Sequence, residues 1–117
     1  MKTLLNTLKD RLTNRQPTVL VTVVASSGST PRGTGARMLV GEEGRIYGTI
    51  GGGAVEYRST QMAVEALKQK SSYTNAFTLT KDDVANLGMI CGGAVTVFFQ
   101  YIGGEREDVL RMVQAAC

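Results

Sequence analysis

Two glycine clusters about forty residues apart set the strongest limit on how this chain folds, GTIGGGAVE at 48–56 and GMICGG at 88–93. Glycine lets the backbone turn tightly and approach another group closely, so each cluster is expected at a seam between regular elements. The first cluster runs straight into a helical pattern, and its amides and the positive helix end should converge on a spot suited to an anion. The second cluster carries Cys91 between Ile90 and Gly92, so its sulfur lies beside backbone that has no side chain. If the clusters meet in the fold, they form a pocket with amides on one wall and a thiol on the other.

Length and composition narrow the classes of protein. The 117 residues suit a single domain, 1–117, with its own core. A net charge of +3 with scattered lysines and arginines argues against a nucleic-acid partner. No stretch reaches the roughly 20 apolar residues of a membrane helix, so no membrane partner is expected. Without a signal-peptide pattern or a disulfide framework, we expect a cytoplasmic protein with reduced thiols.

The hydrophobic pattern predicts a fold of class α+β, α/β-like in character. We expect a single compact domain with a mixed sheet of about five strands covered by about three helices. The expected helices cover 3–14, 54–70 and 105–117. The expected strands cover 18–24, 36–40, 45–48, 73–80 and 94–101. From Ala25 onward, SSGSTPRGTG is expected to leave the sheet as a loop.

Two arginines have double interpretations. Arg32 lies in the polar loop, which is either a solvated turn or a ligand loop at the end of a buried strand. Arg37 shares a strand face with Leu39 and points either into a site or to solvent. A guanidinium suits phosphate or carboxylate in both positions.

The glycine spacing excludes two common nucleotide motifs. No GK[ST] follows the glycines, so a P-loop is absent, and Glu56 stands where a dinucleotide fingerprint from Gly51 needs glycine. Glu56 itself suits the first turn of a helix, where the macrodipole favours a carboxylate, and this competes with a catalytic role. An anion bound beside Glu56 would be repelled unless Arg32 or Arg37 offset the charge.

Cys91 also has two interpretations. It is either a small buried hydrophobic residue or, between glycines and near a helix start, a nucleophile or metal ligand of lowered pKa. The chain contains no histidine, which excludes Ser–His and Cys–His catalysis and histidine zinc sites. A metal site made by the protein alone is therefore not expected.

Three segments together resemble a known family. GSTPRGTGARMLV at 28–40, GTIGGGAVE at 48–56 and GMICGG at 88–93 occur in the order and at spacings similar to those of the N-terminal domain of the XdhC/CoxI family. These are accessory proteins of molybdenum hydroxylases such as xanthine dehydrogenase, an enzyme of purine catabolism, and the aerobic carbon monoxide dehydrogenase. Longer members of that family continue into a Rossmann-like C-terminal domain, and we expect this domain to be absent here.

The resemblance implies a chaperone that binds molybdenum cofactor (molybdopterin), protects it while a cysteine desulfurase adds the sulfido ligand, and inserts it into an apo molybdenum hydroxylase. Its implied partners also include a separate Rossmann-domain protein or a second copy in a homodimer. The family's motif positions fall here at Arg32, Arg37, Gly51, Gly52, Gly53, Glu56, Cys91, Gly92 and Gly93. Cys91 would meet metal only through cofactor-bound molybdenum.

Two other functions remain open from the residues alone. One is a small-molecule transferase or redox enzyme with Cys91 as nucleophile and Glu56 as acid or base. The other is a structural oligomerisation module. No catalytic residue is assigned firmly, and the carrier interpretation makes the chain a maturation factor rather than a turnover enzyme.

Overall fold

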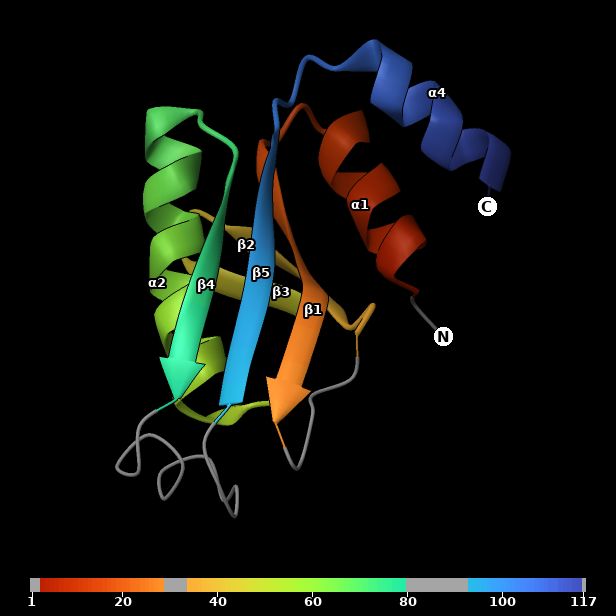
Figure 1. Ribbon diagram of the computed structural model, residues 1–117. Helices are drawn as coiled ribbons and strands as arrows, with labels where there is room; N and C mark the ends of the chain where they lie inside the picture. Colours follow the sequence, from red (N-terminus) through yellow and green to blue (C-terminus); the bar gives the residue numbers. More distant parts are fainter. Residues whose placement is uncertain (1–2, 29–33, 80–92, 117) are drawn as a thin grey trace.

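The computed structural model describes residues 3–28, 34–79 and 93–116. Within these ranges the order of elements is α1 (Leu4–Thr13), β1 (Thr18–Gly28), β2 (Arg37–Gly41), β3 (Gly44–Gly48), α2 (Gly53–Gln69), β4 (Tyr73–Leu79), β5 (Gly93–Ile102) and α4 (Glu107–Ala116). Figure 1 shows the strands forming one curved sheet with helices on both sides. The expected α+β class, with five strands and three helices in one compact domain, is confirmed for the described residues.

The strand order across the sheet is β3-β2-β1-β5-β4, and each described pairing is antiparallel. We expected a mixed sheet, so this detail differs. Helix α2 carries the chain from β3 at one edge to β4 at the other, and β5 then returns between β1 and β4. Because β5 runs antiparallel to both neighbours, β1 and β4 point the same way without touching as a parallel pair.

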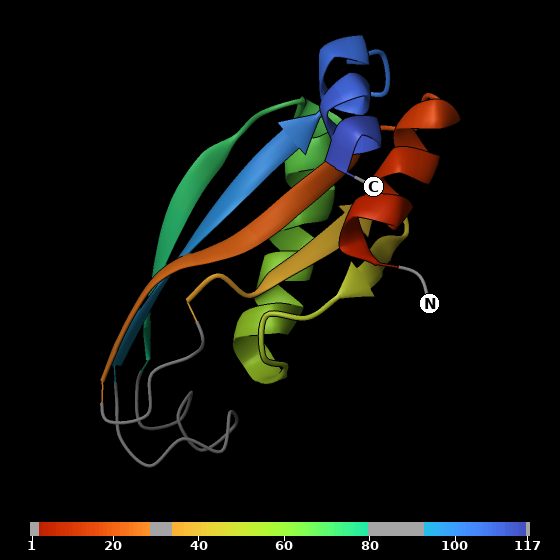
Figure 2. The ribbon, with the colours of Figure 1, turned by 90° about the vertical axis from the view of Figure 1, so that its right-hand side faces the viewer.

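Helices cover the two faces of the sheet unequally. Helix α2 packs its apolar stripe on one face, where Val21, Met38 and Phe99 are fully buried. Helices α1 and α4 pack on the opposite face over Leu39 and Ile102. Figure 2 shows these two helices side by side across the sheet from α2. Strand β2 is thus buried on both faces. The continuous apolar run of β1 predicts the same for β1, but Leu20 and Thr22, on its face away from α2, are only half-buried.

Strand β1 is longer than its sequence suggests. We expected it to end at Val24, whereas it continues to Gly28 opposite Gly93 of β5. The register between β1 and β5 shifts around Val24, between Val23 and Ala25, and the ladder then resumes through Ser26 and Ser27. Pairing with the long β5 strand supplies hydrogen bonds that outweigh the weak strand propensity of serine and glycine.

Helix α1 is fixed to the sheet by one arginine. Arg11 donates from Nε to Thr18 Oγ1 at 3.1 Å and from Nη2 to the Pro17 carbonyl at 2.6 Å. The same Nη2 lies 3.3 Å from the Glu42 carboxylate in the β2–β3 turn. Arg11 thereby connects α1, the start of β1 and the hairpin. Among the described helices, none combines the length and the hydrophobicity that crossing a bilayer requires.

Candidate functional site

The turn between β3 and α2 depends on glycine for its shape. Gly48, Gly51, Gly52 and Gly53 all have positive φ, from 70° to 115°. A Cβ on Gly52 would meet no atom within 4 Å, so glycine is needed there for backbone conformation rather than for space. At Gly48 a Cβ would lie 2.5 Å from the Arg37 carbonyl oxygen. The GGG sequence is therefore explained by the path of the chain.

The Glu56 carboxylate closes this turn. Its Oε1 accepts hydrogen bonds from the amide of Ile50 at 3.0 Å, from the amide of Gly52 at 3.1 Å and from the Thr49 hydroxyl. The amide of Gly51 donates in turn to Thr49 Oγ1 at 3.0 Å. Arg45 approaches from β3, with Nε 3.7 Å from Glu56 Oε2. The anion at the point where the amides converge is therefore the carboxylate of Glu56, a residue in the first turn of α2.

The surroundings of Glu56 fix its charge. Burial raises the pKa of this carboxyl, but the hydrogen bonds from Thr49, Ile50 and Gly52 and the charge of Arg45 together lower it, and the net pKa lies below the ordinary glutamate value. A carboxylate of lowered pKa is ionised at neutral pH and is poorly suited to act as a general acid there. The geometry thus favours the structural interpretation of Glu56.

A bound phosphate at the same amides would have to displace Glu56. The amides of Ile50 and Gly52 already donate to this carboxylate, and a second anion beside it would be repelled. Turn 48–53 therefore does not fit a phosphate in its present arrangement. An anion bound at this end of the molecule would need cations from outside the turn.

The other motif residues lie at several positions around the sheet. Gly93 begins β5 and pairs directly with Gly28 at the end of β1. Arg37 begins β2, is exposed, and by strand alternation shares the Leu39 face, on the side of α1. Arg32, Cys91 and Gly92 lie outside the described residues.

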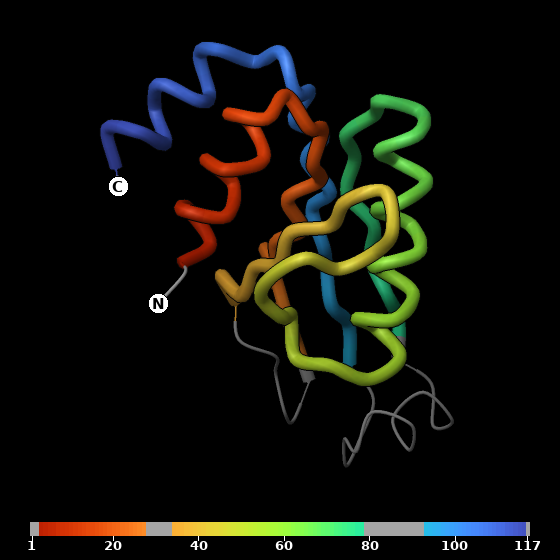
Figure 3. The backbone as a smooth tube through the Cα atoms, turned by 180° about the vertical axis from the view of Figure 1, so that it is seen from behind, coloured from red at the N-terminus to blue at the C-terminus, as the bar shows by residue number. Residues whose placement is uncertain are grey.

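The first and third motif segments are brought together at one end of the sheet. The pair Gly28–Gly93 joins them, because GSTPRGTG starts at Gly28 and GMICGG ends at Gly93. Figures 1 and 3 show turn 48–53 crossing at this same lower end, where α2 begins. All three motif segments thus contribute residues to one end of the molecule.

Sequence reasoning missed Arg45 and Thr49 as partners of Glu56. Thr49 stands seven residues before Glu56, whereas a capping box has a spacing of three, so no known local motif pairs the two residues. Arg45 looked like an ordinary strand arginine. Its Nη1 also donates to the Gly48 carbonyl at 2.6 Å, a contact that follows from the β3-to-turn geometry.

Metal ligands do not gather in the part of the chain that the structure describes. No three Cys, Asp or Glu side chains come together there in a way that would hold an ion.

Comparison with known proteins adds to this geometry. The profile of the XdhC and CoxI family matches residues 12–80. The uncharacterized protein YqeB of Escherichia coli K12 is 37% identical over 94 residues, which cover 80% of this chain and 17% of YqeB.

A crystal structure from Bacillus halodurans, described as a xanthine dehydrogenase, superposes with a TM-score of 0.73 at 27% identity. The match covers 95% of this chain and 34% of that one. The chain therefore spans about a third or less of the length of these relatives. Since the profile match takes in more than half of its residues, the chain belongs to the XdhC and CoxI family.

Proposed function

We propose that this domain is an accessory protein of a molybdenum hydroxylase of the xanthine dehydrogenase or carbon monoxide dehydrogenase type. In this role it binds molybdenum cofactor, assists sulfuration of the cofactor by a cysteine desulfurase, and assists its insertion into the apoenzyme. Family membership and likeness to a structure described as a xanthine dehydrogenase support the proposal. We assign the role to the cytoplasm.

The observation that carries the proposal is the pairing of Gly28 with Gly93. Gly28 and Gly93 belong to two different motif segments and are more than sixty residues apart in the sequence, yet they meet at the end of the sheet where turn 48–53 also lies. Ligand-binding loops are commonly placed at one end of a sheet, on a rigid scaffold. We infer that the cofactor binds at this end.

Molybdopterin carries a phosphate, and its dithiolene holds the molybdenum. In our proposal Arg32 and Arg37 hold the phosphate, since guanidinium groups pair well with phosphate oxygens. Cys91, with Gly92 and Gly93 beside it, approaches the metal side as a soft thiolate. Gly51, Gly52, Gly53 and Glu56 shape the wall of the site, and the negative Glu56 keeps the phosphate toward the arginines. When bound, the cofactor supplies the redox centre that the client enzyme needs.

The test is the pterin content of the protein. The chain is produced in cells that make molybdopterin, purified, and assayed for released pterin by fluorescence. We expect pterin with the wild type, less with Arg32→Ala, and an unchanged amount with Arg111→Ala, whose side chain is 76% exposed on α4. Absence of pterin from the wild type at every salt and redox condition contradicts the proposal.

Cys91→Ser separates the carrier from the rival enzyme. Retained pterin with lost delivery to an apoenzyme fits a carrier. A covalent substrate adduct on wild-type Cys91 that Cys91→Ser abolishes would instead favour nucleophilic catalysis.

A further inference from the structure

The two edges of the sheet differ in how well they are protected from pairing with another chain. Strand β3 has five residues, begins and ends with glycines of positive φ, and carries Arg45. Its register with β2 also shifts between Leu39 and Val40. Short length, irregular register and charge are features that discourage edge pairing.

Strand β4 has none of these features. Its seven residues, YTNAFTL, include no charge, no proline and no glycine, and its register with β5 runs without a shift from Tyr73 to Leu79. Among the described residues, β4 pairs with β5 alone and forms the outer edge of the sheet. Every second residue of such an edge presents an N–H and a C=O away from the sheet.

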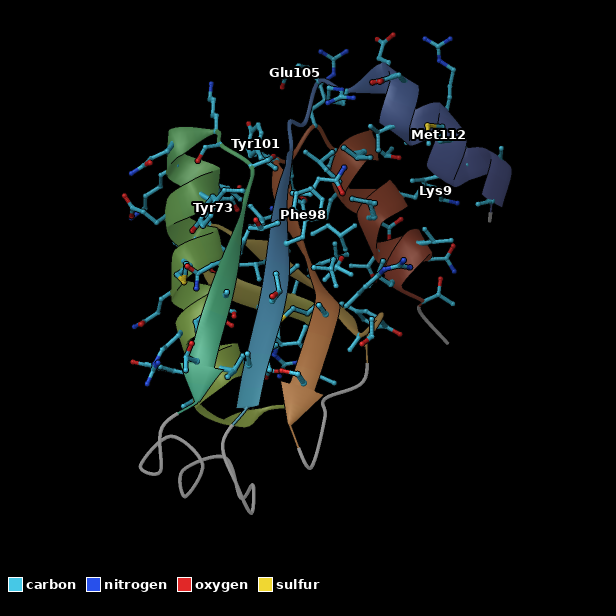
Figure 4. All side chains as sticks on the ribbon, viewed as in Figure 1. Lys9, Tyr73, Phe98, Tyr101, Glu105 and Met112 are labelled. Carbon is cyan, nitrogen blue, oxygen red and sulfur yellow. The ribbon has the colours of Figure 1, made fainter. Side chains whose placement is uncertain are left out.

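This edge is held firmly in place from inside. Phe77 is buried in the core beneath α2, and the ring of Tyr73 stacks on Phe99 with centroids 5.0 Å apart. Figure 4 shows Tyr73 at the upper end of β4, with Phe98 labelled on the neighbouring strand. Because core aromatic residues already hold β4 in place, little conformational entropy of β4 would be lost when a partner strand pairs with it.

The exposed side chains of β4 are symmetric in sequence. Thr74, Ala76 and Thr78 are exposed and alternate with the inward Phe77. Two copies of β4 paired antiparallel around Ala76 would place Thr74 opposite Thr78 of the second copy and Ala76 opposite itself. Threonine pairs across strands are favourable, and no like charges would face each other.

We propose that β4 pairs with β4 of a second copy of this chain, antiparallel about a two-fold axis at Ala76, so that the two sheets join into one. A two-fold pairing is closed and uses the same surface on both partners, which the Thr-Ala-Thr row supplies. This symmetry favours a second copy over an unrelated peptide strand.

Sedimentation equilibrium of the full chain tests the pairing. We expect a reversible dimer for the wild type and a monomer for Ala76→Lys, which places two lysines opposite each other at the axis. The matched control is Ala25→Lys. Ala25 is exposed in the same cross-strand row, since it pairs with Thr96, which pairs with Ala76, but it lies two strands inside the edge. A wild type that stays monomeric, or a dimer lost equally in both variants, overturns the proposal.

Cross-linking gives a second test, which does not require a variant that destabilises the dimer. In a background of Cys91→Ser and Cys117→Ser, Ala76→Cys should form a disulfide-linked dimer on mild oxidation, because directly opposed residues in antiparallel strands lie within disulfide range. Thr74→Cys should not, since it faces position 78. Mixing Thr74→Cys with Thr78→Cys should restore the link. Cross-linking of Thr74→Cys with itself, or none at Ala76→Cys, contradicts the arrangement.

Discussion

Replacing Glu56 with glutamine removes the charge around which turn 48–53 closes. The carboxylate accepts from Thr49, Ile50 and Gly52 and faces Arg45, while its side chain is only 17% exposed. A hydrogen bond to a charged group contributes about 1.5–3 kcal/mol, and glutamine keeps one acceptor oxygen for part of this set. We therefore expect Glu56→Gln to lower the free energy of unfolding by about 1–2 kcal/mol at neutral pH.

Glu56→Ala should cost more, because it leaves the Ile50 and Gly52 amides without their acceptor. Each unsatisfied buried donor costs about 1–3 kcal/mol, so the total is expected near 3 kcal/mol. A domain of this size has about 5–15 kcal/mol of stability, so both variants should still fold. Urea unfolding followed by circular dichroism measures the difference.

The pH dependence gives the sharper test. The pKa of Glu56 is lowered in the folded protein, so its contribution is complete above the ordinary glutamate pKa and is lost as the pH falls through the folded value. The stability difference between wild type and Glu56→Gln should therefore shrink in acid. The control is Glu65→Gln, an exposed position on the same helix, for which we expect less than about 0.5 kcal/mol at any pH. A Glu56→Gln difference that is zero at neutral pH, or equal at every pH, would refute the reasoning.

Three further stability predictions use the same unfolding assay. Ser59 is fully buried on α2 and its hydroxyl has no hydrogen-bond partner among the described residues, so Ser59→Ala should stabilise the protein by about 1 kcal/mol, and a loss of stability would show that the hydroxyl is satisfied. Gly52→Ala should lower the free energy of unfolding by about 1–2 kcal/mol, because Gly52 has a φ of 77°. Gly48→Ala should lower it more, because the new Cβ would also meet the Arg37 carbonyl oxygen. A larger loss for Gly52→Ala than for Gly48→Ala would contradict the geometry. Arg11→Ala should lower the free energy of unfolding by about 2 kcal/mol, because the hydrogen bonds to Thr18 and to the Pro17 carbonyl are lost. Glu42→Gln should lower it clearly less, because the Glu42 side chain is 53% exposed. Equal losses would mean that the ion pair with Glu42 dominates.

Local patterns in the sequence predicted most of the elements well. Helix 54–70 was expected from the spacing of Val55, Ala63 and Ala66, and all three side chains are buried in α2. The hairpin 36–48 and the cover helix 3–14 followed from turn signals and leucine spacing, and both are confirmed. In each case the pattern lies within one element or between neighbours, where side-chain periodicity directly reflects burial.

Features that depend on distant partners were not predictable in this way. The extension of β1 through Ser27 to Gly28 arises from pairing with β5, some sixty to seventy residues later. The direction of β4 in the sheet depends on where α2 ends. The contact between Glu56 and Arg45 depends on the angle between β3 and α2. No local propensity contains this information.

The proposed cofactor site requires Cys91 to lie near turn 48–53. A nitroxide label on Cys91, in a Cys117→Ser background, would broaden the amide NMR signals of nearby residues. If the site is as proposed, broadening is strong at Gly51, Gly52 and Gly53 and weak at Gly103 and Gly104, which follow β5 at its opposite end. A label that broadens the signals of Gly103 and Gly104 while the signals of the three turn glycines stay sharp would rule out this site.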